Sequence, residues 1–161
     1  MAFTDLYFSL GSNLGDRRQH ILDAVDALDG SLGVRCAALS HIIETEPWGF
    51  GSRNRFLNAC VRYRIYREAD VTAQGLRILA QCKEIERRLG RSAGPGYAAD
   101  GSRIYRDRPI DIDILFIGAE HIDTETLTVP HPLIAQRDFV LIPLREIAKP
   151  ALKRAFPDLF D

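Results

Sequence analysis

The alternation of apolar and polar residues predicts four β-strands along the chain. Residues 56–66 alternate most regularly, and residues 6–10 form a short apolar run before a glycine-containing turn. Residues 34–44 are also strand-like, although their first half does not alternate cleanly. Residues 108–117 combine isoleucine-rich alternation with turn-forming residues on either side, which indicates a buried strand.

Apolar residues at helical spacing predict two long helices between these strands. The first covers residues 16–29, with Asp16 as its N-cap and Gly30 as its end. The second begins after its N-cap, Asp70, and ends before Gly90. Each helix therefore presents an apolar stripe to the sheet.

The predicted order of elements is βαββαβ, followed by shorter helical segments. This order predicts an α+β fold of the ferredoxin-like type, in which an antiparallel sheet carries helices on one face. Residues 133–149 add a C-terminal helical extension. We expect one domain, residues 1–161, because this length can bury a single core and no linker or repeat interrupts it.

Composition and charge argue against several classes of protein. The formal net charge of −1 provides no general positive field, so we expect no nucleic-acid partner; local arginine clusters favour a small anionic ligand instead. Cys36, Cys60 and Cys82 lack the spacing of a metal site or a disulfide framework, which predicts core thiols. Because no signal peptide or membrane-spanning apolar run is apparent, we expect a cytoplasmic protein without a membrane partner.

Candidate chemistry centres on Asp111 and Asp113, which alternation places on the same face of a strand, about 6–7 Å apart at Cα. Two carboxylates this close repel each other unless a cation or another partner lies between them. Divalent ions take carboxylate oxygens, and a pair of ions suits phosphoryl transfer. A solvated strand face or an arginine-paired surface is the alternative. The opposite, apolar face is predicted to carry Ile110, Ile112, Ile114 and Phe116.

Other residues suggest a ligand site near this strand. Phe56 and Asn58 point to the same face, which suits a flat heterocycle stacked on the ring and recognised by the amide. A half-buried aromatic beside a turn-side asparagine is the alternative for this pair. Residues 91–107 lack periodicity, and their arginines predict a mobile lid that clamps phosphate. His131 lies between two prolines, which favours a functional role as much as a structural one.

These motifs together resemble the 6-hydroxymethyl-7,8-dihydropterin pyrophosphokinase family of folate biosynthesis. The resemblance covers nearly the whole chain in the family's order and spacing. It implies a ferredoxin-like fold and transfer of diphosphate from ATP to the hydroxymethyl oxygen of the pterin, with release of AMP. The motifs are residues 8–16 (FSLGSNLGD), 56–59 (FLNA), 85–91 (IERRLGR), 108–115 (RPIDIDIL) and 127–131 (LTVPH).

The resemblance also implies roles for individual residues. Asp111 and Asp113 would hold two Mg²⁺ ions that bridge the phosphates of the co-substrate ATP, while Arg91 and Arg108 would be catalytic residues that contact phosphates. The substrates would be ATP and the hydroxymethyl dihydropterin, and we expect a monomer. The implied pterin-binding residues are Thr45, Trp48, Phe56, Asn58 and Phe139. The implied ATP-binding residues are Glu86, Ile114, Thr128, His131 and Arg137.

The chain departs from the family pattern mainly in the predicted lid, which is longer. Residues 105–108 are Tyr-Arg-Asp-Arg where Trp-Gly-Pro-Arg is common, and Ala93 stands in place of a second lid arginine. Arg103 or Arg106 could substitute for that arginine. Phe56 stands where a tyrosine is usual, which keeps the stacking ring and removes the hydroxyl.

Two other functions remain as alternatives. A ferredoxin-like binding module for nucleic acid or a regulatory metabolite places aromatic and basic residues on its sheet, and Phe56, Arg62 and Arg64 share a face. The near-neutral charge and the paired carboxylates, which repel phosphate without metal, argue against this module. An inactive relative of the family is the second alternative, because the lid is altered.

Overall fold

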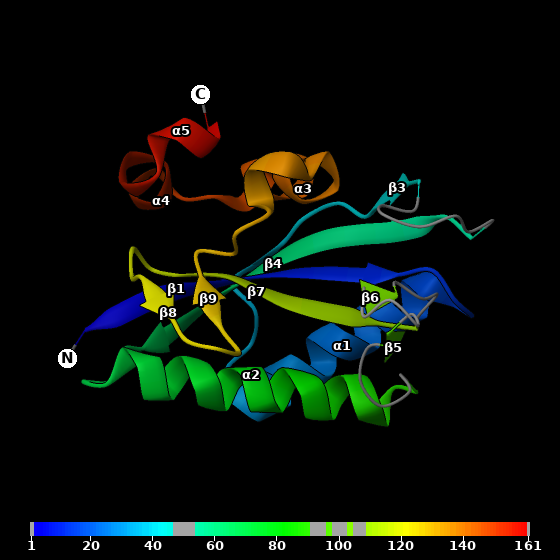
Figure 1. Cartoon of the computed structure of the whole chain (residues 1–161), viewed down its shortest axis with the longest axis horizontal. Helices are drawn as coiled ribbons and strands as arrows, with labels where there is room; N and C mark the ends of the chain where they lie inside the picture. Colours follow the sequence, from blue (N-terminus) through cyan, green and yellow to red (C-terminus); the bar gives the residue numbers. More distant parts are fainter. Residues whose placement is uncertain (1, 47–53, 91–95, 98–102, 105–108, 161) are drawn as a thin grey trace.

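The computed structural model describes residues 2–46, 54–90, 96–97, 103–104 and 109–160 (Figure 1). Its strands are β1 (Phe3–Ser12), β2 (Ala38–Leu39), β3 (Ile43–Thr45), β4 (Phe56–Tyr66), β5 (Gly96–Tyr97), β6 (Arg103–Ile104), β7 (Asp111–Ile117), β8 (Ile122–Asp123) and β9 (Thr128–Val129). Its helices are α1 (Arg17–Leu32), α2 (Val71–Arg88), the 3₁₀ turn η1 (Ile134–Gln136), α3 (Asp138–Ile147), α4 (Pro150–Ala155) and α5 (Pro157–Phe160).

The main sheet is antiparallel and has β1 between β4 and β7. On its far side β4 pairs with both β2 and β3, so the second predicted strand is present as two short pieces separated by residues 40–42. Together with the interleaved helices α1 and α2, this sheet confirms the predicted α+β class. The ends of β1 and the starts of β4 and β7 meet at one end of the sheet, on the right in Figure 1.

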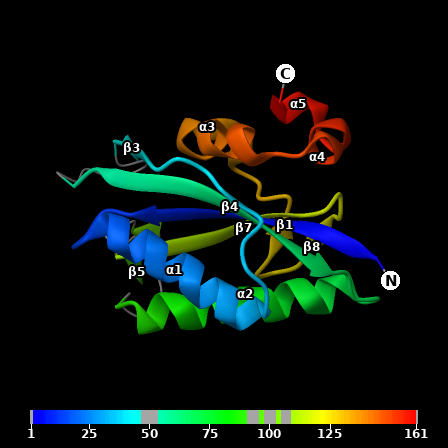
Figure 2. The ribbon, with the colours of Figure 1, turned by 180° about the vertical axis from the view of Figure 1, so that it is seen from behind.

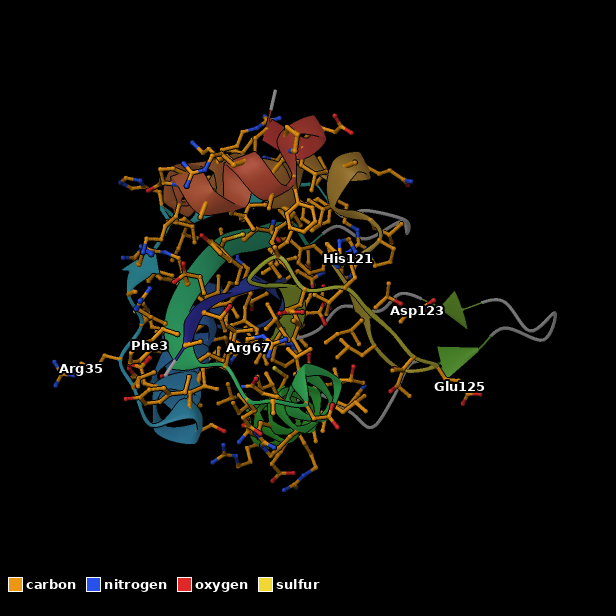
Figure 3. All side chains as sticks on the ribbon, turned by 90° about the vertical axis from the view of Figure 1, so that its left-hand side faces the viewer. Phe3, Arg35, Arg67, His121, Asp123 and Glu125 are labelled. Carbon is orange, nitrogen blue, oxygen red and sulfur yellow. The ribbon has the colours of Figure 1, made fainter. Side chains whose placement is uncertain are left out.

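The helices form layers on both faces of the main sheet. Helices α1 and α2 cover one face, while the C-terminal helices α3, α4 and α5 cover the other (Figures 1 and 2). Seen along the sheet from the end that carries Phe3 and Arg67, side chains fill the space on both sides of the strands (Figure 3). The C-terminal extension predicted from residues 133–149 corresponds to η1 and α3, while α4 and α5, which were not predicted, complete the second helical layer.

Helix boundaries follow the predicted caps at three of four ends. The side chain of Asp16 accepts a hydrogen bond from Gln19 N at 3.2 Å and begins α1, and Asp70 begins α2 in the same way. The predicted end of the first helix at Gly30 is wrong, because α1 continues through this residue to Leu32. Gly33, with φ of 73°, adopts the left-handed conformation that ends the helix.

A β-bulge in β7 changes which side chains face the two helical layers. Tyr7 of β1 lies opposite Phe116, but the next residue, Phe8, lies opposite Ile114, so Leu115 is the extra residue. Ile110, Ile112 and Ile114 pack toward α1 and α2, as predicted, whereas Phe116 packs in the core beneath the C-terminal helices. The prediction that Phe116 shares the face of the isoleucines is therefore wrong.

The cysteines and the helices bear on two further predictions. Cys60 and Cys82 are buried free thiols, which confirms their place in the core, while Cys36 is partly exposed. None of the helices described here is long and apolar enough to cross a membrane.

Candidate active site

The register of the sheet places the main candidate residues on one face, across three strands. Gly11 of β1 lies opposite Asn58 of β4 and Asp111 of β7, and Ser9 lies opposite Asp113. Residues that pair directly across neighbouring strands share a face, so Asn58, Gly11 and Asp111 form one row. Two strand spacings separate Asn58 from Asp111 by about 10 Å. Asp111 and Asp113 thus share a face, as predicted, and both are partly exposed.

Gly11 allows the side chains of Asn58 and Phe56 to approach the middle of this row. A Cβ atom at this position would lie 3.1 Å from Asn58 Oδ1 and 3.5 Å from Phe56 Cδ1, closer to the amide than ordinary packing allows. Gly11 was predicted to lie in a turn after a short strand, whereas β1 continues through it to Ser12. A glycine inside a strand signals a close approach by a ligand or another chain segment, and this signal could have identified it.

Asn58 and Thr45 form a hydrogen-bonded pair on the β4 side of Gly11. Asn58 is only 3% exposed, and its Nδ2 donates to Thr45 Oγ1 at 2.6 Å. Thr45 is the last residue of β3 and lies opposite Phe56, the first residue of β4. The hydroxyl therefore fixes the amide of Asn58 beside the Phe56 ring, the arrangement predicted for recognition of a flat heterocycle.

The start of α3 carries Phe139 and also Arg137, which lies beside Asp113 on the β7 side of the row. Arg137 Nη1 lies 3.8 Å from Asp113 Oδ2, with side chains 11% and 32% exposed, respectively. The guanidinium of Arg137 also lies over the ring of Phe139, 5.6 Å from its centroid. The structure thus places a sheltered cation next to the acidic pair, where it can meet an anionic group.

His131 is held beside β7, and its imidazole is neutral. Its backbone N donates to Leu115 O at 3.0 Å, and its Nδ1 accepts from Leu133 N at 3.2 Å. Burial, together with the Arg137 guanidinium, lowers the pKa of His131 from 6.5 to about 4, although the Asp111 carboxylate opposes this shift. With Nδ1 an acceptor, the ring proton lies on Nε2, which can donate a hydrogen bond to a ligand.

Glu86 reaches the acidic strand from α2. Its side chain is 8% exposed, and Oε2 accepts a hydrogen bond from Ile112 N at 2.8 Å. Ile112 is the residue between Asp111 and Asp113, so this carboxylate contacts the backbone of the acidic pair. The resemblance implied contact between Glu86 and ATP; the geometry shows a contact with the protein backbone.

The remaining candidates lie elsewhere or outside the described residues. Ile114 is 3% exposed in the core toward α1 and α2, so only its backbone is placed to meet a ligand. Thr128 lies exposed on β9. Trp48, Arg91 and Arg108 fall outside the described residues, as does most of the predicted lid.

The donor set suits a metal ion that is bound together with a phosphate ligand. In the described part of the chain, no group of three or more His, Cys, Asp or Glu side chains is arranged to hold a metal ion. Asp111 and Asp113 supply carboxylate oxygens from one strand only. Mg²⁺ is characteristically bound by one or two carboxylates, with water and substrate phosphates completing its coordination, so this pair fits a magnesium–nucleotide complex.

Comparisons with known proteins identify the family of this chain. A family model described as 7,8-dihydro-6-hydroxymethylpterin-pyrophosphokinase (HPPK) matches residues 7–149. A 2-amino-4-hydroxy-6-hydroxymethyldihydropteridine pyrophosphokinase from Porphyromonas gingivalis is 42% identical over 144 residues, which cover 89% of this chain and 90% of that protein. Proteins of the same name from Methylorubrum extorquens and Bacillus subtilis are 37% and 36% identical; the alignments cover 90% and 92% of this chain and 83% and 81% of those proteins.

Proposed function

Since the chain belongs to the 7,8-dihydro-6-hydroxymethylpterin-pyrophosphokinase family, and is an ATP-dependent diphosphotransferase of folate biosynthesis, we propose how its residues carry out the transfer. The proposed reaction moves the β- and γ-phosphates of ATP to the hydroxymethyl oxygen of 6-hydroxymethyl-7,8-dihydropterin. The bond between the β-phosphorus and the oxygen that bridges it to the α-phosphorus breaks, and this oxygen leaves with AMP, while the β-phosphorus gains the pterin oxygen. The hydroxyl proton leaves to solvent.

The pterin is proposed to bind on the β3–β4 side of Gly11. Asn58, oriented by Thr45, would recognise the polar edge of the heterocycle, and Phe56 and Phe139 would stack on its faces. Trp48 completes this set of pterin-binding residues in the proposal. The supporting observation is that Asn58 and the Phe56 ring both approach Gly11, so the amide and the ring lie together at one point of the sheet.

The triphosphate is proposed to bind on the β7 side. Asp111 and Asp113 would hold Mg²⁺, which would supply positive charge to neutralise the phosphates, and we propose two ions, as the family resemblance implies. Arg137 and His131 Nε2 would add donors, and Arg91 and Arg108 would contact phosphates. Glu86, Ile114 (through its backbone) and Thr128 complete the proposed ATP side.

The observation that carries the proposal is the single row Asn58–Gly11–Asp111. It puts an amide suited to a heterocycle and a carboxylate suited to magnesium about 10 Å apart on one face, with no side chain between them at Gly11. Phosphoryl-type transfer depends mainly on positioning and charge neutralisation, so a strong general base is not required. The neutral state of His131 agrees with a role as hydrogen-bond donor.

Product analysis tests the proposal. The purified chain is incubated with ATP, Mg²⁺ and 6-hydroxymethyl-7,8-dihydropterin, and the phosphorus-containing products are identified by ³¹P NMR. We expect AMP and a pterin diphosphate ester in equal amounts, with neither product when pterin or Mg²⁺ is omitted. Formation of ADP instead of AMP, or no turnover, would contradict it; the latter is the outcome for a binding module or an inactive relative.

A further inference from the structure

Among the described residues, side-chain and loop groups hold the outer edge of β7, and no further long strand pairs with it. On its inner side β7 pairs with β1. On its outer side, Ile112 N donates to Glu86 Oε2 at 2.8 Å and Leu115 O accepts from His131 N at 3.0 Å. A strand edge otherwise presents unpaired backbone groups, so these two bonds substitute for part of a ladder. Of the two, only the bond from Ile112 lies between the aspartates.

Burying the charged carboxylate of Glu86 costs free energy. Glu86 is 8% exposed and follows Cys82 by one helical turn on the buried side of α2. Burial raises the pKa of the Cys82 thiol, and the charges of Glu86 and Asp113 raise it further. Burying a carboxylate has a desolvation cost that hydrogen bonds must offset, and an apolar side chain would cover the same core surface without this cost.

We infer that Glu86 is a positioning residue, whose buried carboxylate holds the backbone between Asp111 and Asp113 so that both aspartates face the phosphate side. This inference rests on the proposed function and goes beyond it, because it gives Glu86, on the proposed ATP side, a role that acts through the strand that carries the metal ligands. Asp111 is the first residue of β7 and pairs with Gly11 of β1 on the inner side of the strand. The bond at Ile112 extends the support to both sides of that end.

Two substitutions separate the hydrogen bond from the charge. Glu86→Gln keeps an acceptor oxygen of similar size and removes the charge, whereas Glu86→Leu removes both. Gln74→Leu is the matched control: Gln74 is 4% exposed at the other end of α2, its Nε2 donates to Tyr66 O at 2.8 Å, and its Oε1 accepts from Glu68 N at 3.1 Å. Gln74→Leu thus removes comparable buried bonds from the same helix, far from the aspartates.

The readout is the affinity for a non-hydrolysable ATP analogue with Mg²⁺, measured by calorimetry, beside amide exchange at Ile112. We expect Glu86→Leu to weaken binding about 10–100-fold, the usual cost of losing a group that orients a metal ligand, and to expose the Ile112 amide to exchange. Glu86→Gln should stay within about threefold of wild type, with the amide still protected. Gln74→Leu should lower the melting temperature without changing binding.

The outcomes separate failure of this inference from failure of the proposed function. If wild type and Gln74→Leu show magnesium-dependent binding but Glu86→Leu binds equally well, the positioning role is wrong while the function stands. If Glu86→Gln loses as much affinity as Glu86→Leu, charge and not the hydrogen bond is responsible, and the inference also fails. An unprotected Ile112 amide in wild type overturns it even if Glu86→Leu does not fold. Absence of magnesium-dependent binding in wild type defeats both.

Discussion

The two faces of the main sheet differ in what covers them and in what they leave open. Toward α1 and α2 the strands contribute an apolar layer that includes Leu6, Phe8, Leu10 and Val61. Toward α3, α4 and α5 the layer is apolar only in part, because polar residues replace it where β1 ends and β4 and β7 begin. The face toward α1 and α2 therefore contributes mainly to stability. The face toward α3, α4 and α5 contributes partly to the core and partly to the candidate ligand site. Four predictions test this division, from the largest effect to the smallest.

Removing either aspartate should abolish most turnover without unfolding the protein. Asp111→Ala or Asp113→Ala should lower the rate of AMP formation by about 10²–10³-fold. The reason is that the variant would lack a carboxylate to hold the Mg²⁺ that neutralises the phosphates. Asp26→Ala, at an exposed position of α1 on the opposite face of the sheet, is the control and should keep wild-type activity. Circular dichroism checks the fold. A fully active Asp111→Ala or Asp113→Ala variant would remove the metal assignment.

Equal cavities on the two faces should have equal effects on stability and unequal effects on substrate binding. Leu28→Ala in α1 and Leu144→Ala in α3 each truncate a buried leucine side chain. Each should lower the free energy of unfolding, measured in urea, by about 2–5 kcal/mol. Because α3 carries Arg137 and Phe139 at its start, only Leu144→Ala should also raise KM for the pterin. If both variants raise KM equally, the two faces are not functionally distinct.

The hydroxyl of Thr45 should matter through the amide that it orients. Thr45→Val leaves the buried Nδ2 of Asn58 without this acceptor, a loss of about 1–3 kcal/mol for a buried polar group. We expect pterin affinity to fall about tenfold, measured with Mg²⁺ and a non-hydrolysable ATP analogue present. Thr45→Ser keeps the hydroxyl and should bind nearly as wild type. Equal affinities for the valine and serine variants would show that the hydroxyl does not orient the site.

The lowered pKa of His131 predicts a modest dependence of stability on pH. Between its ordinary pKa of 6.5 and the folded value of about 4, the unfolded chain binds a proton that the folded chain does not. The contribution to stability is therefore complete above pH 6.5 and decreases as the pH falls toward 4. Urea unfolding at pH 7 and pH 5 should show a smaller decrease for His131→Gln than for wild type. Parallel decreases would contradict a buried neutral His131.

Local sequence patterns were sufficient to predict most of the face that α1 and α2 cover. Regular alternation predicted β4 at Phe56–Tyr66, and the caps Asp16 and Asp70 marked where α1 and α2 begin. Gly30 was mistaken for a helix end because a glycine is tolerated inside a helix at an open position, and its Cβ position has no neighbour within 4 Å. The positive φ that distinguishes Gly33 is not visible in the residue type.

The site face was less predictable because it depends on contacts between distant residues. Alternation placed Asp111 and Asp113 together, but it could not reveal the bulge at Leu115 that turns Phe116 toward the C-terminal helices. The hydrogen bond from Ile112 N to Glu86 joins positions 26 residues apart, and no periodic pattern encodes such a contact. The family resemblance implied that Asp111, Asp113 and Glu86 are site residues, but it did not show which residues contact one another.

The most direct test of the central claim is the magnesium dependence of nucleotide binding. A non-hydrolysable ATP analogue is titrated into wild type and into the double variant Asp111→Asn, Asp113→Asn, with and without Mg²⁺. The account predicts that Mg²⁺ strengthens binding to wild type by at least about tenfold and has almost no effect on the double variant. The same magnesium dependence in both proteins would contradict it.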